Sequence, residues 1–241
     1  MPMKFSRRAE MRCTFVTLFP EIVEGYFTAS ILGRAIEAGH LQIDFVNPRD
    51  YSENRYKKVD EAMIGGGAGM LMSPQPLDSA LRAIRAQSPE ARILFLSPVG
   101  KPFRQNDARR LAKSEIHLVF VAGRYEGIDE RLIELYADEV FAVGDAVLTG
   151  GELPAMLCCD AVARLLPGVL GNADSLAVES FDASLLEAPS FTKPDEFRGK
   201  RIVSEFLKGN HSKIAAIKNR MAWAKTQYFR PDLYQKAKAK L

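Results

Sequence analysis

Short apolar runs alternate with helix-like patterns from residue 12 to about residue 169. The runs are continuously apolar, as in IHLVFVA at 116–122, and do not alternate apolar with polar residues. Strands of this kind are buried on both faces, which is typical of a parallel sheet covered by helices. Expected strands are 12–19, 41–48, 92–97, 116–122 and 138–144, and expected helices are 20–27, 31–39, 76–86, 106–112, 128–137 and 153–166. We therefore predict an α/β domain with parallel strands and crossover helices.

The pattern changes after Pro167. Residues 171–187 are rich in small and turn-forming residues, which predicts a linker between a first domain at 11–170 and a second at 188–241. In the second domain, apolar residues recur at helical spacing between lysines and arginines, and a further helix is expected after Pro231. The second domain is therefore expected to be small, basic and mainly helical.

Charge is distributed unevenly along the chain. The formal net charge is +3, but residues 193–241 hold 13 basic and 4 acidic side chains, whereas residues 1–192 hold 20 and 26. A basic segment on a slightly acidic body suggests a polyanionic partner, although a solvated basic helix has the same composition. Charge alone does not distinguish DNA from RNA.

Composition excludes several classes of protein. No apolar run approaches the ~18 residues of a membrane helix, and the first ten residues lack the apolar core of a secretory signal. The three cysteines, Cys13, Cys158 and Cys159, form no C-x-x-C motif, so we expect reduced core residues and neither disulfides nor a zinc site. We therefore predict a cytoplasmic protein without membrane segments, in which residues 1–10 are a polar tail.

Three successive loops after expected strands carry glycine, at 96–100, 122–127 and 143–154. Such loops lie at the edge of an open α/β sheet where ligands bind, and glycine lets main-chain groups approach a ligand closely. The chain has no dinucleotide-binding or P-loop glycine spacing, no H-E-x-x-H and no G-x-S-x-G. We expect a nucleoside-sized ligand held without a phosphate cradle, a description that S-adenosylmethionine fits.

Several long motifs point to one family. They are NPRDYSENRYKKVDEAMIGGGAGMLMSPQPL, LSPVGKPF, AGRYEGIDERLIE, VGDAVLTGGELPAMLCCDAVARLLPGVLG, FTKPDEFRGKRIV, GNH and FRPDL, in that order. From about Met11 to Leu233 the chain resembles the bacterial tRNA (guanine-N1-)-methyltransferases. The resemblance implies a homodimeric, S-adenosylmethionine-dependent enzyme with a trefoil-knotted SPOUT domain. It also implies a tRNA substrate, not DNA, methylated at N1 of the guanosine immediately 3′ of the anticodon, position 37, where the preceding nucleotide is guanosine.

The resemblance also assigns site residues. The cofactor pocket would comprise Leu96, Ser97, Pro98, Gly100, Gly123, Tyr125, Glu126, Gly127, Val143, Gly144, Asp145, Ala146, Val147, Leu148, Gly150, Gly151 and Pro154. Arg164 matches the family's catalytic arginine, and its alternative interpretation is an i, i+4 ion pair with Asp160. Near the glycine-rich stretch at 64–70, four charged residues would face tRNA or a second subunit, or would simply form a charged surface loop: Arg49, Asp50, Arg55 and Lys57.

The sequence departs from the family pattern at several positions. Glu179 aligns with the general-base aspartate, and Asp174 or Asp182 is the alternative base. Ala146 replaces a common aromatic residue and Val99 replaces a glutamine. In the C-terminal helix, Ile217-Lys218 stands where the family usually has Trp-Arg.

The resemblance suggests a mechanism. Glu179 would accept the N1 proton of guanine, while Arg164 would stabilise the negative charge that develops on O6. This scheme requires no metal and we expect no metal ligands, although the family is described as Mg²⁺-dependent. Two other functions fit the sequence: methylation of another RNA position, such as a ribose 2′-hydroxyl, and RNA binding by a module with a relict pocket.

Overall fold

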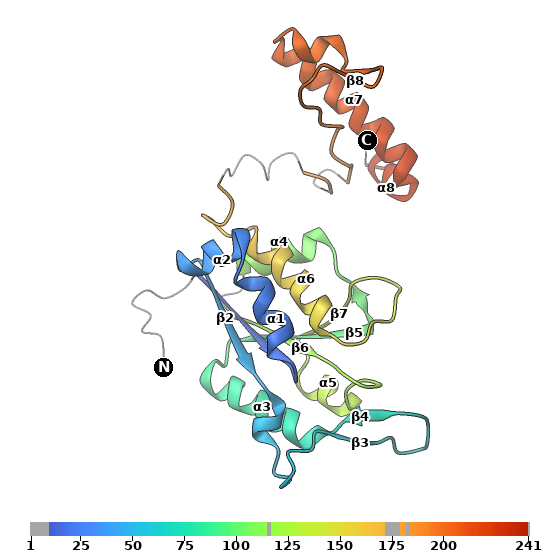
Figure 1. Ribbon diagram of the computed structural model, residues 1–241. Coiled ribbons are helices and arrows are strands. Elements are labelled where there is room, and N and C mark those ends of the chain that lie inside the picture. Colours follow the sequence, from blue (N-terminus) through green and yellow to red (C-terminus); the bar gives the residue numbers. More distant parts are fainter. Residues whose placement is uncertain (1–9, 115–116, 172–178, 182–183, 241) are drawn as a thin grey trace. The chain divides into compact units, whose positions relative to one another are not determined.

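The computed structural model describes residues 10–114, 117–171, 179–181 and 184–240 of the chain. The chain forms two compact units, residues 1–171 and 172–241 (Figure 1). Residues 1–9 of the expected tail lie outside the described residues, as do the alternative bases Asp174 and Asp182.

A five-stranded parallel sheet forms the centre of the first unit, in the order β2-β1-β6-β5-β7. Its strands are β1 (Met11–Val16), β2 (Leu41–Val46), β5 (Arg92–Pro102), β6 (His117–Ala122) and β7 (Glu139–Ala142). All six residues of the central strand β6 are buried, as the continuous apolar pattern predicted. Across the sheet Phe15 lies beside Phe45 and Phe120, with ring centroids 6.1 and 5.3 Å away. The predicted parallel sheet is confirmed.

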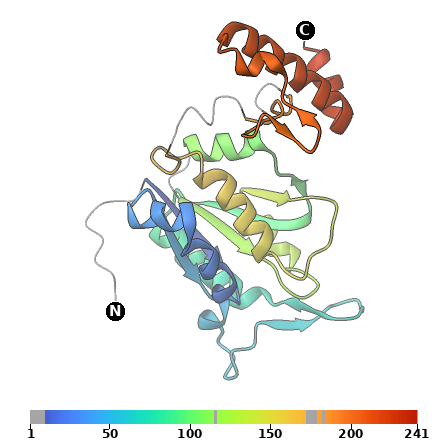
Figure 2. The same cartoon turned by 45° about the horizontal axis from the view of Figure 1, so that its top comes forward.

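Helices cover both faces of this sheet (Figures 1 and 2). Those on one face are α1 (Pro20–Phe27), α2 (Ser30–Glu37), α4 (Gln105–Ser114) and α6 (Glu152–Ala163); those on the other are α3 (Pro74–Gln87) and α5 (Glu130–Tyr136). Alternate residues of each strand contact the two layers: Leu94 of β5 packs with the first group and Ile93 with the second. Two apolar cores thus form on one sheet, and the expected crossover helices are confirmed.

Three features of the first unit were not predicted. A short antiparallel hairpin, β3 (Asp60–Ala62) and β4 (Met70–Met72), brackets the glycine-rich segment 63–69, and a 3-10 helix, η1, spans Pro48–Tyr51. Strand β5 extends beyond the predicted end at Ser97: Leu96 and Lys101 both pair with Phe141, so the residues between them bulge out of the strand. The first glycine loop is therefore an excursion within β5. The trefoil knot implied by the resemblance stays a prediction.

The second unit is mainly helical, as expected. Strands β8 (Glu196–Phe197) and β9 (Lys200–Arg201) form a two-stranded antiparallel sheet. The helices of this unit are the 3-10 helix η3 (Ser204–Leu207), α7 (His211–Phe229) and α8 (Pro231–Lys238). The Asn210 side chain caps α7 by accepting from the Lys213 N–H. The Leu186 N–H donates to Thr226 Oγ1 at 2.8 Å, so part of the segment expected as a linker is bonded to α7.

No helix among the described residues is both long and apolar enough to cross a membrane. The three cysteines are free and buried in the first unit, as predicted. Burial raises the pKa of Cys158 to about 12, which keeps its thiol protonated and unreactive. The described residues contain no group of three or more histidine, cysteine, aspartate or glutamate side chains that could hold a metal ion.

Candidate active site

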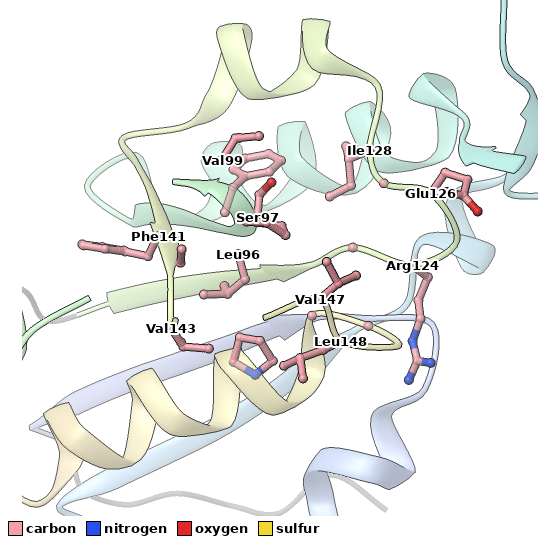
Figure 3. Close-up of a pocket in the computed structure, with 18 of the residues that line it drawn as sticks. Leu96, Ser97, Val99, Arg124, Glu126, Ile128, Phe141, Val143, Val147 and Leu148 are labelled. Carbon is pink, nitrogen blue, oxygen red and sulfur yellow. The ribbon is translucent and has the colours of Figure 1, made fainter. Parts of the chain in front are cut away.

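A cavity of about 410 Å³ lies where β5, β6 and β7 meet their three glycine-bearing loops (Figure 3). Every residue predicted for the cofactor pocket lines this cavity except Gly100 and Asp145. The predicted residues in the lining are Leu96, Ser97, Pro98, Gly123, Tyr125, Glu126, Gly127, Val143, Gly144, Ala146, Val147, Leu148, Gly150, Gly151 and Pro154. They converge because neighbouring parallel strands deliver their loops to one edge of the sheet.

Gly100 lies outside the lining, between β5 and β7, and its predicted contact with the cofactor stays a prediction. A Cβ at this position would lie 2.6 Å from the Phe141 nitrogen and 2.7 Å from the Val140 carbonyl carbon. The absence of a side chain therefore lets β5 approach the backbone of β7 closely. Asp145 is exposed in the third loop, outside the lining.

Several lining residues were not predicted: Leu71, Phe95, Val99, Arg124, Ile128, Glu130, Ile133, Phe141 and Ala142. Val99 and Arg124 belong to loops that the sequence singled out. Leu71 reaches the cavity by tertiary contacts, because the Met72 N–H donates to the Gly127 carbonyl and the Glu126 N–H to the Met70 carbonyl. These two bonds fasten β4 to the second loop, and no sequence pattern indicated that pairing.

The cavity has apolar walls with few charged groups. Figure 3 shows Leu96, Val143 and Leu148 on the side of the cavity formed by α6 and the third loop, with Val99 and Ile128 on the opposite side. The charged residues in the lining are Arg124, Glu126 and Glu130. Apolar walls with glycine-rich main chain suit a nucleoside base, and two carboxylates suit a cationic substituent. Ala146 and Val99, two departures from the family pattern, both line this cavity.

The two predicted catalytic residues belong to different units. Arg164 is half-buried at the C-cap of α6 in the first unit, and its N–H donates to the Asp160 carbonyl at 3.0 Å. The Asp160 carboxylate accepts a hydrogen bond from Tyr26, and this bond, with burial, raises the pKa of Tyr26 to about 12. Glu179 is half-buried in the second unit. Catalysis by Arg164 with Glu179, and the ion pair of Arg164 with Asp160, both stay predictions.

The charged residues near the glycine-rich hairpin lie at the surface. Asp50, Arg55 and Lys57 are exposed and Arg49 is half-buried. Beside them Tyr56 is 82% exposed, and Ile64 in the β3–β4 connection is fully exposed.

The second unit carries a further cavity, of about 530 Å³. Phe191 and Phe206 line it with their ring centroids 5.8 Å apart, and Lys193 and Lys218 contribute positive charge. Ile214, Ile217 and Met221 are half-buried along α7, while Lys213, Lys218 and Arg220 are exposed. The predicted basic amphipathic helix is therefore present.

Known proteins of one family match this chain along almost its whole length. A family model described as tRNA (Guanine-1)-methyltransferase TrmD matches residues 11–236. A tRNA (guanine-N(1)-)-methyltransferase from Sulfurovum sp. (strain NBC37-1) is 64% identical over 226 residues, which cover 94% of this chain and 99% of the relative. Proteins with the same name from Campylobacter curvus (strain 525.92) and Wolinella succinogenes are 59% and 55% identical, and each alignment covers at least 95% of both chains.

Proposed function

Since the chain belongs to the tRNA (guanine-1)-methyltransferase family, we propose that it transfers a methyl group from S-adenosylmethionine to N1 of a guanosine in tRNA. The proposed target is the guanosine at position 37, immediately 3′ of the anticodon, when the preceding nucleotide is also guanosine. The observation that carries the proposal is the single cavity that gathers the three glycine-bearing loops.

The cavity fits S-adenosylmethionine in size and chemistry. Its volume of about 410 Å³ falls in the range of small-molecule sites. Apolar side chains and main chain would hold the adenine and ribose, and Glu126 and Glu130 would attract the positively charged sulfonium and ammonium groups. The bound cofactor supplies an electrophilic methyl group.

Two residues supply the proton chemistry in this proposal. Neutral guanine carries a proton on N1, and the Glu179 carboxylate accepts it as the N1–methyl bond forms and the methyl–sulfur bond breaks. Arg164 donates hydrogen bonds to O6, where negative charge develops, and a guanidinium does so without losing its own proton. No step of this scheme uses Mg²⁺.

The second unit is the proposed tRNA-binding surface. Its helices α7 and α8 contain exposed lysines and arginines that would contact phosphates, and such contacts weaken steeply as salt rises. The aromatic cavity beside Lys218 is suited to stacking against an unpaired base. We assign residues 188–241 to tRNA binding and residues 11–170 to the cofactor. The site of action would be the cytoplasm, where tRNA and reduced cysteines coexist.

We further propose that the protein is a homodimer that associates through α1 and α6. Ile22 and Tyr26 of α1 and Leu153 and Leu157 of α6 are between 45% and 59% exposed, on helices that contact each other. Exposed apolar side chains gathered on two neighbouring helices support a protein interface there. Covering it with the same surface of a second copy produces a closed twofold dimer.

The test is methyl transfer from labelled S-adenosylmethionine to two tRNA transcripts that differ only in guanosine or adenosine at position 37. Labelling of the guanosine transcript alone, with N1-methylguanosine after nucleoside digestion, is the expected result. Label recovered as a ribose 2′-O-methyl group would support the alternative target instead. A protein that binds tRNA but no S-adenosylmethionine would be an RNA-binding module.

A further inference from the structure

A buried charged cluster lies beside the cavity, and the proposed chemistry gives its residues no role. Glu152, the first residue of α6, is 2% exposed. The Thr17 hydroxyl donates to Glu152 Oε1 at 2.7 Å, and Arg124 Nε donates to the same oxygen at 3.0 Å. Arg124 Nε also lies 2.9 Å from Oε2. We call Thr17, Arg124 and Glu152 the Glu152 cluster.

The Glu152 cluster joins three segments at the carboxyl edge of the sheet. Thr17 follows β1, and its Oγ1 also accepts the Phe19 N–H at 3.0 Å. Arg124 follows β6; its guanidinium lies 4.5 Å from the centre of the Phe19 ring, and Nη1 donates to the Thr149 carbonyl at 3.4 Å. Figure 3 shows the Arg124 side chain turned away from Leu96 and Val143. Arg124, which also contributes to the cavity lining, therefore connects the second and third loops.

Gly150 shows how closely the third loop rests on this ion pair. A Cβ at Gly150 would lie 2.5 Å from Arg124 Nε and 2.6 Å from Glu152 Oε2. Gly150 also lines the cavity. The position of the Arg124–Glu152 pair therefore sets the position of a lining residue.

A buried ion pair is weak evidence for stability, because apolar residues of similar volume often stabilise a fold as well. Its directional bonds do fix geometry, since each donor must keep its distance and angle to an acceptor. A cluster that holds binding loops in place acts on the ligand without touching it. That role explains a buried carboxylate that is paired with a residue of the cavity lining.

We propose that Thr17 and Glu152 are positioning residues for the S-adenosylmethionine pocket: through Arg124 they hold the third loop against the second in its binding conformation. The inference rests on the proposed function, because it takes the cavity as the cofactor site.

The first test is isothermal titration of the full-length protein with S-adenosylmethionine in the absence of tRNA. Thr17→Val keeps the side-chain shape and removes the hydroxyl; we expect the Kd to rise about tenfold, the effect of a lost buried hydrogen bond. Thr17→Ser restores the hydroxyl and should restore most of the affinity.

Thr14→Val is the matched control. Thr14 is also buried on β1, and its hydroxyl lies 2.9 Å from His117 Nε2, away from the cavity lining. This variant loses one buried hydroxyl contact where Thr17→Val loses two, so its melting temperature should also fall, while its Kd for S-adenosylmethionine stays within about twofold of wild type. Equal Kd values for the two valine variants would overturn the proposal.

Steady-state kinetics test the role of the Glu152 carboxylate. Glu152→Gln keeps the size but removes the charge, and we expect the KM for S-adenosylmethionine to rise while kcat at saturating cofactor stays within about twofold, because Glu152 takes no part in the proposed proton chemistry. A fall in kcat with unchanged KM would contradict a positioning role. If Glu152→Gln does not fold, the Thr17 series still decides the question.

Different results would overturn the proposed methyltransferase function and the positioning role of Thr17 and Glu152. Wild-type protein that binds no S-adenosylmethionine would overturn the proposed function and this inference with it. Wild-type binding with Thr17→Val indistinguishable from Thr14→Val would overturn this inference alone.

Discussion

Gly100→Ala is expected to destabilise the first unit by about 2 kcal/mol, although Gly100 lies outside the cavity lining. The added Cβ would meet the Phe141 nitrogen at 2.6 Å and two β7 carbonyl carbons at 2.7 Å. An ordinary van der Waals contact between these atoms is about 1 Å longer, and the β7 backbone atoms cannot rotate away from the new Cβ as a side chain could. β7 must shift, and overpacking of this kind costs about 1–3 kcal/mol.

β7 is poorly placed to absorb this shift. It is a four-residue edge strand whose one partner among the described strands is β5, so displacing it strains ladder hydrogen bonds worth about 0.5–1.5 kcal/mol each. For a protein of this size, 2 kcal/mol lowers the melting temperature by about 4–8 °C. Because Phe141 and Ala142 line the cavity, the Kd for S-adenosylmethionine should rise as well.

The assay is urea unfolding followed by far-UV circular dichroism. The single tryptophan, Trp223, lies in the second unit, so its fluorescence does not report on the sheet. Gly144→Ala is the matched control, since a Cβ there meets nothing within 4 Å and the position is also in a glycine loop. A Gly100→Ala protein with the stability of the control would refute the argument from close backbone approach.

Four further predictions test other parts of the molecule. Burial holds the pKa of His117 at about 4, below its ordinary 6.5, so the unfolded chain binds more protons and the free energy of unfolding should fall by about 3 kcal/mol as pH drops from 6.5 to 4. Urea midpoints at pH 6.5 and pH 4 measure this, and a His117→Gln variant with the wild-type slope would contradict it. Glu179→Gln should abolish methyl transfer but leave the Kd for S-adenosylmethionine near wild type; retained activity would reject Glu179 as the base. Leu157→Asp should dissociate the proposed dimer in sedimentation equilibrium, whereas Leu135→Asp should not, although Leu135 on α5 is more exposed, at 69%, than Leu157, at 47%; a dimeric Leu157→Asp would place the interface elsewhere. Lys218→Ala should weaken tRNA binding and reduce its log–log salt slope by about one, and an unchanged slope would remove Lys218 from the phosphate contacts.

The local sequence pattern predicted the parallel strands, the boundary between two helices and the position of the cavity. Continuous apolar runs predicted parallel strands because a strand buried on both faces has no polar side, and β6 is buried along its whole length. Pro231 predicted the boundary between α7 and α8, because proline has no backbone N–H to donate to the preceding helical turn. Glycine-bearing loops after successive strands indicated the cavity, because parallel strands bring their carboxyl ends to one edge.

Only the tertiary structure decided which residues meet across long separations. The sequence alone does not order the strands as β2-β1-β6-β5-β7, nor does it separate Gly100, which spaces two strands, from the glycines that line the cavity. Glu152 stands in a loop-to-helix segment where an acidic residue ordinarily faces solvent, yet it is buried against Thr17, 135 positions earlier. Propensity and periodicity act over a few neighbouring residues, whereas burial and ion pairing depend on every segment that packs against a group.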